Sequence, residues 1–111
     1  MKKYVVDIDG TICDKPECRE DCDYHESIPK PNRIAKINKL YDEGHHITYF
    51  TARGMGRYSD NADLAKESFY DITELQLRLW GCKYHRLILG KPSGDFYIDD
   101  KGINANEFFG D

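Results

Sequence analysis

The sequence lacks any long apolar run, and this absence excludes several classes of protein. None of its 111 residues belongs to a stretch approaching the roughly 20 consecutive apolar residues of a membrane-spanning helix. The basic start Met1-Lys2-Lys3 is followed by too few apolar residues for the core of a secretory signal. We therefore expect one cytoplasmic domain over residues 1–111 that makes no contact with a membrane.

An excess of basic residues is also missing. The chain has 16 Lys and Arg against 20 Asp and Glu, which gives a net charge of −4. This balance disfavours a nucleic-acid scaffold, because binding to a phosphate backbone needs a basic surface. The composition, 40% hydrophobic and 32% charged, is typical of a globular domain with a modest core.

The CxxC pairs that are typical of zinc sites are absent, although the chain has four cysteines. Cys13, Cys18 and Cys22 gather with His25 in one short segment, and Cys82 lies far along the chain. In a cytoplasmic protein this spacing favours reduced thiols, so we expect no zinc. A metal or redox site in the segment, or a structural disulfide, is the alternative.

Repeats, low-complexity tracts and linkers are lacking too, and what remains is an alternation of strands and helices. Clusters of β-branched and aromatic residues predict strands, and apolar residues at helical spacing predict helices. The predicted strands cover residues 3–8, 46–50, 84–89 and 96–98, and the predicted helices cover residues 31–43, 62–80 and 103–109.

The sequence makes two further predictions, one about the helix over residues 62–80 and one about residues 12–30. The middle helix should break near Tyr70, because Asp71-Ile72-Thr73-Glu74 has the spacing of a capping box. Its second part should bury a face made of Ile72, Leu75, Leu79 and Trp80. Residues 12–30 are polar and show no period, so we expect a long loop that acts as a flap over the functional site.

The alternation favours an α/β fold with a parallel sheet and right-handed crossovers. If the fourth predicted strand lies beside the first, the strand order is 3-2-1-4. Ligands of such sheets bind beyond the carboxyl ends of the strands, at the point where the order reverses. This topology predicts that Asp99 and Asp100 meet Asp7 and Asp9 at one site.

Asp7 and Asp9 follow the first predicted strand directly, and Gly10 comes next. Residues i and i+2 of a strand point to the same side, so both carboxylates can face one point in space. Their mutual repulsion calls for a proton or a cation between them. Mg²⁺, a hard cation that prefers oxygen ligands, suits this position.

The ends of the other strands carry groups that suit a phosphate. Thr51 offers a hydroxyl, and the backbone N–H groups of the turn that begins at Ala52 can hold anionic oxygens. Lys91 adds a positive charge. An aspartate can attack phosphorus to form an aspartyl-phosphate, and a second carboxyl can transfer the protons. Arg53 is a candidate contact for a distal group of the substrate.

These residues resemble the motifs of the haloacid dehalogenase (HAD) superfamily of phosphohydrolases. The stretch Asp7-Ile8-Asp9-Gly10-Thr11 resembles the first motif, and residues 47–51 resemble the second. Lys91 fits the third motif, and Asp99-Asp100 fits the fourth. The resemblance implies a Rossmann-like three-layer sandwich, and it implies that Asp7 is the nucleophile.

The same resemblance implies the remaining roles. Asp9 would be the general acid and base, and Mg²⁺ would be held by the Asp7 side chain, the Asp9 backbone carbonyl and Asp99. Thr51, with the neighbouring turn, and Lys91 would hold the transferring phosphoryl group. Asp100 would support Asp99 or Lys91, or reach the metal through water.

The chain is similar to the smallest members of that superfamily, which have no cap domain. Among them are phosphatases of capsule-polysaccharide biosynthesis, and the similarity lies in Thr51-Ala52-Arg53-Gly54, Gly90-Lys91-Pro92 and Ile98-Asp99-Asp100-Lys101. It implies a small phosphorylated metabolite as substrate, such as a sugar phosphate or nucleotide, with a nucleic-acid end less favoured. A second subunit that encloses the open site is one alternative, and a regulatory module that binds metal and phosphate without turnover is another.

Overall fold

The computed structural model describes residues 1–15 and 23–111, so Cys18 and Cys22 lie outside the described residues. The elements, in chain order, are β1 (Lys3–Val6), η1 (Tyr24–Glu26), α1 (Pro31–Asp42), β2 (His46–Thr51), α2 (Ala62–Leu79), β3 (Arg86–Leu89) and α3 (Ala105–Phe109). No helix in the described ranges is both long and apolar enough to cross a bilayer.

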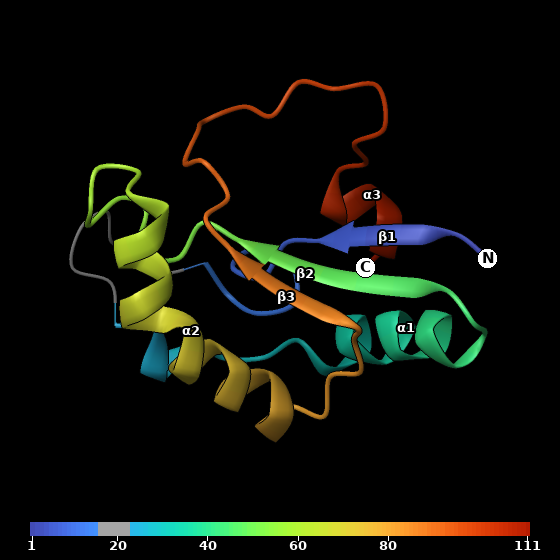
Figure 1. Ribbon diagram of the computed structural model, residues 1–111. Helices are drawn as coiled ribbons and strands as arrows, with labels where there is room; N and C mark the ends of the chain where they lie inside the picture. Colours follow the sequence, from blue (N-terminus) through green and yellow to red (C-terminus); the bar gives the residue numbers. More distant parts are fainter. Residues whose placement is uncertain (16–22) are drawn as a thin grey trace.

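The strands form a parallel sheet in the order β1-β2-β3, with β2 in the middle. Figure 1 shows α1 and α2 on the same side of this sheet. Two right-handed crossovers that advance in one direction place both helices there. The predicted α/β class with a parallel sheet is confirmed.

One face of the sheet and the two long helices make the core. Ile47 and Tyr49 of β2 are fully buried, together with Ile37 of α1 and Leu77 of α2. The other face is lined by strand residues alone, which form a shallow groove: Lys3, Val5, His46, Thr48, Phe50, Arg86 and Ile88. Val5 in this groove is 68% exposed.

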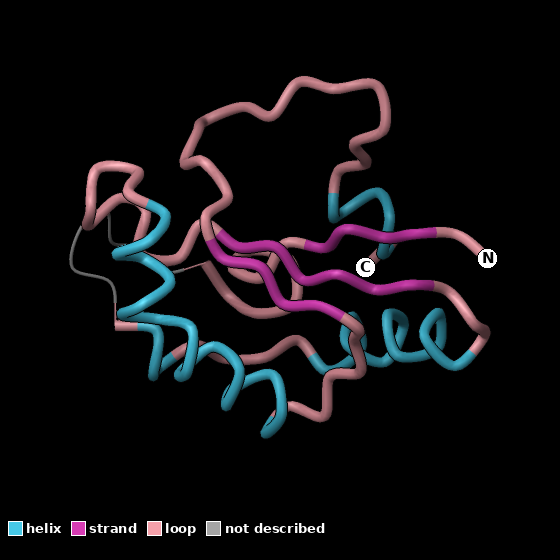
Figure 2. Tube along the Cα trace, in the orientation of Figure 1, coloured by secondary structure: helices cyan, strands magenta, loops and turns pink. Residues whose placement is uncertain are grey.

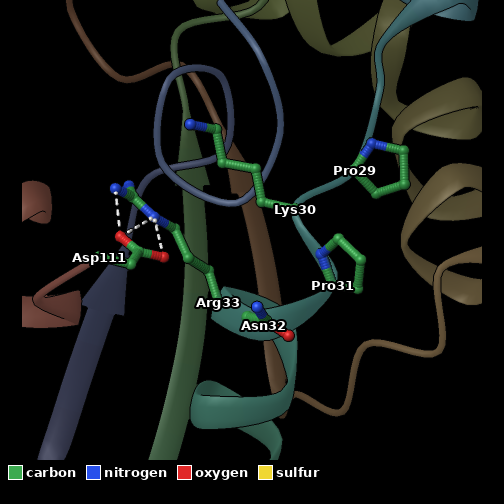
Figure 3. A pocket seen from close by; sticks show the side chains of 6 residues that line it. All are labelled: Pro29, Lys30, Pro31, Asn32, Arg33 and Asp111. Carbon is green, nitrogen blue, oxygen red and sulfur yellow. Dashed lines mark hydrogen bonds and ion pairs between the residues drawn. The ribbon is translucent and has the colours of Figure 1, made fainter.

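α3 packs back against the start of the fold. Arg33 of α1 is buried and donates from Nε to Asp111 Oδ1 at 3.0 Å and from Nη2 to Asn106 Oδ1 at 2.8 Å. Figure 3 shows Arg33 and Asp111 with the neighbouring residues of the α1 start. Phe108 lies against Tyr4 of β1, with ring centres 6.2 Å apart. The C-terminal end is thus tied to α1 and β1.

The break predicted near Tyr70 is wrong, because α2 runs from Ala62 to Leu79 without interruption. Its N-cap is Asn61, whose side chain accepts the Leu64 N–H at 3.1 Å. The buried residues of the helix are Ala65, Thr73, Gln76 and Leu77. The expected apolar face is wrong as well, since Leu75 is 44% and Leu79 is 74% exposed. Burial of one continuous face overrides the local capping signal.

The fourth predicted strand is not formed by the described residues. Residues 92–104, which we call the arm, are all exposed and connect the end of β3 to α3. Only residues 90–95 separate β3 from the predicted strand at Phe96. A crossover between parallel strands needs about a dozen residues or more, so this connection is too short to carry the chain across the sheet.

Candidate active site

The first acidic pair lies in a tight turn at the carboxyl edge of the sheet. Ile8, between the two aspartates, is fully buried, and its carbonyl accepts the N–H groups of Thr11 and Ile12 at 3.0 and 2.9 Å. Gly10 makes the turn with a φ of 80°, a conformation that side chains disfavour. This buried turn holds Asp7 and Asp9 in place at the end of β1.

Asp9 is bound by Arg53 through both of its oxygens. Arg53 Nε lies 3.0 Å from Asp9 Oδ2, and Nη2 lies 3.0 Å from Oδ1. The Cys13 thiol adds a third contact to Oδ1, at 3.4 Å. A bidentate guanidinium contact of this kind fixes the plane of a carboxylate as well as its position.

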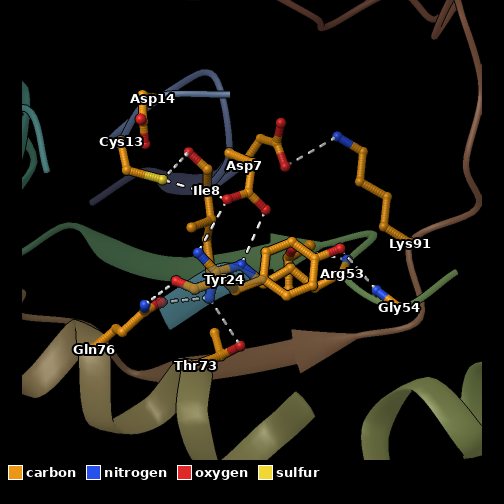
Figure 4. Close-up of polar contacts among 12 residues, drawn as sticks. Asp7, Ile8, Cys13, Asp14, Tyr24, Arg53, Gly54, Thr73, Gln76 and Lys91 are labelled. Atoms are coloured by element: carbon orange, nitrogen blue, oxygen red, sulfur yellow. Dashed lines mark hydrogen bonds and ion pairs between the residues drawn. The ribbon is translucent and has the colours of Figure 1, made fainter. Parts of the chain in front are cut away.

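The Arg53 side chain is itself enclosed, with 1% of its surface exposed. Its Nη1 donates to Thr73 Oγ1 at 3.2 Å and to Gln76 Oε1 at 2.5 Å. The Tyr24 ring from η1 lies 4.6 Å from the guanidinium carbon. Figure 4 shows these side chains converging on Arg53 from α2 and from η1.

The prediction that Arg53 contacts a distal substrate group is therefore wrong for this structure, since Arg53 is buried against Asp9. The sequence reading also missed its partners Tyr24, Thr73 and Gln76. Thr73 and Gln76 are three residues apart on one helix face, beside buried Leu77. Two polar residues on a buried helix face need a partner, and that signal points to a buried charge.

Asp7 faces the other cation of the site. Lys91 Nζ lies 3.7 Å from Asp7 Oδ1, and the Asp7 side chain is 36% exposed. Burial raises the pKa of Asp7 above its ordinary value, and the charge of Lys91 opposes that rise. Lys91 reaches this place because its N–H continues the pairing of β3 with β2, donating to the Thr51 carbonyl at 3.2 Å.

Thr51 lies at the end of β2 and is 1% exposed. Its hydroxyl accepts the Arg53 N–H at 3.1 Å, which helps to direct that side chain toward Asp9. Ala52 begins the next turn, and its carbonyl accepts the Met55 N–H at 2.9 Å. Gly54 follows with a φ of 80°, and its N–H donates to Tyr24 Oη at 3.1 Å.

Asp99 and Asp100 do not join this group. Both are exposed on the arm, and Asp99 Oδ1 accepts the N–H groups of Lys101 and Gly102 at 2.7 and 2.5 Å. These hydrogen bonds lower the pKa of Asp99. Across residues 1–15 and 23–111, no three Asp, Glu, His or Cys side chains gather in a way that could hold a metal ion. The predicted convergence of both acidic pairs within one chain is wrong.

The described cysteines behave as thiols. Cys13 and Cys82 are free, and the buried Cys13 thiol donates to Asp9 and to the Ile8 carbonyl. Burial, with the nearby Asp9 charge, raises the pKa of Cys13 to about 12, so this thiol stays protonated at neutral pH. His25 is exposed and pairs with Asp23 at 2.8 Å.

The fold is that of a Rossmann-like α/β domain with a parallel sheet. A structural-genomics target from Vibrio cholerae, solved by crystallography, superposes with a TM-score of 0.86 at 29% identity. The match covers 98% of this chain and 88% of that one.

A second crystal structure is similar in fold alone. It is the D,D-heptose 1,7-bisphosphate phosphatase from B. bronchiseptica, complexed with magnesium and phosphate, with a TM-score of 0.55 and 16% identity. The match covers 86% of this chain and 52% of the phosphatase. No protein-family profile and no curated protein matches the sequence.

Proposed function

We propose that this protein is a Mg²⁺-dependent phosphomonoester hydrolase that acts through an aspartyl-phosphate intermediate. The observation that carries the proposal is the asymmetry of the two carboxylates at the end of β1. Asp9 is locked to Arg53 through both oxygens at 3.0 Å, whereas Asp7 meets Lys91 at a longer 3.7 Å. One carboxylate is thus positioned for proton transfer, and the other is open to a substrate.

Asp7 is the proposed nucleophile. Its carboxylate is partly exposed at the end of β1, where a phosphorus atom can approach. Attack by one Asp7 oxygen forms the bond to phosphorus, and the bond from phosphorus to the leaving oxygen breaks. Water then cleaves the aspartyl-phosphate, which releases phosphate and regenerates the Asp7 carboxylate.

Asp9 is the proposed general acid and base. A carboxylate has about four acceptor positions, and Arg53 and Cys13 occupy three of those on Asp9. The remaining position can hold the proton that passes to the leaving oxygen and is later taken from water. Arg53 therefore determines which lone pair of Asp9 takes part in proton transfer.

The donors around Asp7 fit Mg²⁺ in part. This ion takes one or two carboxylates and completes its shell with water and phosphate oxygens. Asp7 and the Asp9 backbone carbonyl are proposed to hold it, whereas Asp99, the second carboxylate expected from the sequence, lies apart on the exposed arm of the same chain. When bound, Mg²⁺ supplies charge that neutralises and orients the phosphate. The magnesium and phosphate in the heptose bisphosphate phosphatase are consistent with this choice.

Lys91, the Thr51 hydroxyl and the Ala52 N–H are proposed to bind the phosphoryl oxygens, because the N–H groups of Arg53, Gly54 and Met55 already have acceptors. Lys91 is placed to contact both Asp7 and a phosphate bound to it. Asp100 is proposed to support Asp99. We propose a small phosphorylated metabolite as substrate, such as a sugar phosphate or a nucleotide.

The test is phosphate release from a panel of phosphomonoesters, with Mg²⁺ and with EDTA. Asp7→Asn should abolish release at unchanged folding, whereas Asp71→Asn, at an exposed position of α2, should leave it intact. EDTA should stop the wild-type reaction. Equal release by Asp7→Asn and wild-type protein would refute the assignment of the nucleophile.

A regulatory module that binds metal and phosphate is the second candidate. It is favoured by one observation, the position of Asp99 on the exposed arm rather than beside Asp7. Calorimetry with Mg²⁺ and inorganic phosphate separates the two functions. Binding without hydrolysis of any ester in the panel would favour the module.

A further inference from the structure

The sheet has an open edge at β1. β1 pairs with β2 on one side, and no strand of the described ranges pairs with its other side. An unpaired strand edge presents a row of backbone N–H and C=O groups that can receive another strand. Every copy of the chain therefore has a strand edge at β1 that can accept one more strand.

The arm contains a segment that can form such a strand. Phe96, Tyr97 and Ile98 are consecutive strand-forming residues, and they are 85%, 53% and 95% exposed. Both ends of the arm are held, by Lys91 at β3 and by α3 at Arg33. Figure 2 shows the arm as a loop that stands away from the sheet between these two anchors. Apolar residues exposed in this way on an anchored segment indicate an interaction surface.

The arm cannot fill the β1 edge of its own chain in the direction of the other strands. β3 and the open edge are separated by the full width of the sheet, about 14 Å for three strand spacings. The chain must also return to the start of β1 before it can run parallel to it. Residues 90–95 provide six positions, about half of what a parallel crossover needs.

We propose that two copies of this chain form a two-fold dimer in which residues 96–98 of each arm pair with β1 of the other copy. One chain bears both the open edge and the unpaired strand, so a two-fold axis satisfies both copies at once and the assembly closes. Addition of a strand to an exposed edge is a common mode of recognition.

The sequence of the arm fits β1 in one parallel register. With the partner's Ile98 opposite Val6, the partner's Phe96 lies opposite Tyr4, and both enter the face that packs on the helices. The partner's Tyr97 then lies beside Val5, on the grooved face. The most exposed residues of the arm thereby become the most buried.

Charges agree with the same register. The partner's Asp95 lies opposite Lys3, where the charges attract. The partner's Asp99 follows the strand as Asp7 follows β1, so it arrives beside Asp7. Arg53 and Lys91 already face Asp9 and Asp7. A third carboxylate adds repulsion that a bound cation would offset, and this last step rests on the proposed function. The second carboxylate for Mg²⁺ would then come from the partner subunit.

Light scattering after gel filtration tests the dimer without reference to activity. Wild-type protein should have the mass of two chains, and the double variant Phe96→Ser/Ile98→Ser should have the mass of one with an unchanged circular dichroism spectrum. Leu79→Ser, which removes a 74% exposed apolar residue from α2, should remain dimeric. A monomeric wild type, or a dimeric double variant, would overturn the arm exchange.

Mixed dimers test the shared site. Asp7→Asn and Asp99→Asn proteins should each be inactive alone, and the two are unfolded and refolded together. Half of the dimers are then mixed and hold one complete site, so about a quarter of the wild-type activity should return if the arm is exchanged. Mg²⁺ binding measured by calorimetry should recover by the same fraction. If a refolded dimer recovers neither hydrolysis nor Mg²⁺ binding, Asp99 does not contribute to the site of the other subunit. If hydrolysis is absent from every protein, including wild type, the Mg²⁺ titration and the measured mass still test the proposal.

Discussion

Arg53 donates two hydrogen bonds of 3.0 Å to Asp9, which lies 44 positions earlier in the sequence. Around this pair, Thr73 and Gln76 accept hydrogen bonds from Nη1 of Arg53, and Tyr24 covers the guanidinium plane. The turn after β2, α2 and the η1 segment thus all contribute to the position of one carboxylate. A buried charge held by so many partners is a positioning device for the residue that it contacts.

The first prediction concerns this pair. Arg53→Lys keeps a positive charge but loses the planar fork, so Asp9 is free to rotate. We expect kcat to fall by about 10²-fold, the cost of a misplacement of about 1 Å, with a smaller change in KM. Arg78→Lys, at a position 72% exposed, is the matched control. An unchanged kcat in Arg53→Lys would show that the fork does not position Asp9.

The second prediction concerns stability and the protonation of Asp7. Because burial raises its pKa in the folded state, the folded protein binds this proton more tightly than the unfolded chain does. The stability of the metal-free wild type should therefore decrease as pH rises above the ordinary range of an aspartate. Asp7→Asn does not ionise, so it should melt at a higher temperature than wild type at pH 7, with a smaller difference at pH 4. Thermal melts in EDTA measure this, and equal differences at the two pH values would contradict it.

Part of the site could be predicted from sequence because of one rule. Parallel strands end at a common edge of a sheet, so residues that follow strand ends meet there. Asp7 and Lys91 follow β1 and β3, Thr51 is the last residue of β2, and the structure brings the three together. The bounds of β1, β2 and β3 were predicted within a few residues, whereas the fourth predicted strand is not formed by the described residues.

The position of Asp99 was not predictable by that rule. The strand-forming residues at Phe96–Ile98 indicate a tendency to pair, but they do not say which edge receives them. The short connection over residues 90–95 was the physical clue, since it excludes a parallel crossover within one chain. The buried state of Arg53 was missed for another reason, because arginine is usually exposed and its partners lie 20 or more positions away.

The third prediction concerns Lys91 and the pH dependence of hydrolysis. Mg²⁺ binds the ionised carboxylate of Asp7, so at limiting Mg²⁺ kcat/KM should fall as pH drops through the pKa that burial raises in the metal-free site. Lys91 opposes that rise, so Lys91→Met should move the acidic limb of the pH profile to higher pH. Lys39→Met, at an exposed position of α1, should leave the limb in place. If the acidic limb of Lys91→Met lay at the same pH as that of wild type, Lys91 would not influence the pKa of Asp7.

The fourth prediction concerns the turn that carries Arg53. A Cβ on Gly54 would lie 2.5 Å from the Phe69 ring, and the residue also has a φ of 80°. Gly44 has a similar φ of 93° but open space where a Cβ would lie. Gly54→Ala should therefore lose more stability than Gly44→Ala, by about 1–3 kcal/mol for the overpacking alone. Urea unfolding measures both variants, and equal losses would mean that Phe69 can move aside.

The same variant links the turn to the reaction. The Gly54 N–H donates to Tyr24 Oη, and the Tyr24 ring covers Arg53, so a shift of this turn should disturb the Arg53 contact to Asp9. Gly54→Ala should accordingly lower kcat under conditions where the variant is fully folded, whereas Gly44→Ala should not. Folded Gly54→Ala protein with the kcat of wild type would show that the turn stabilises the fold without positioning Asp9.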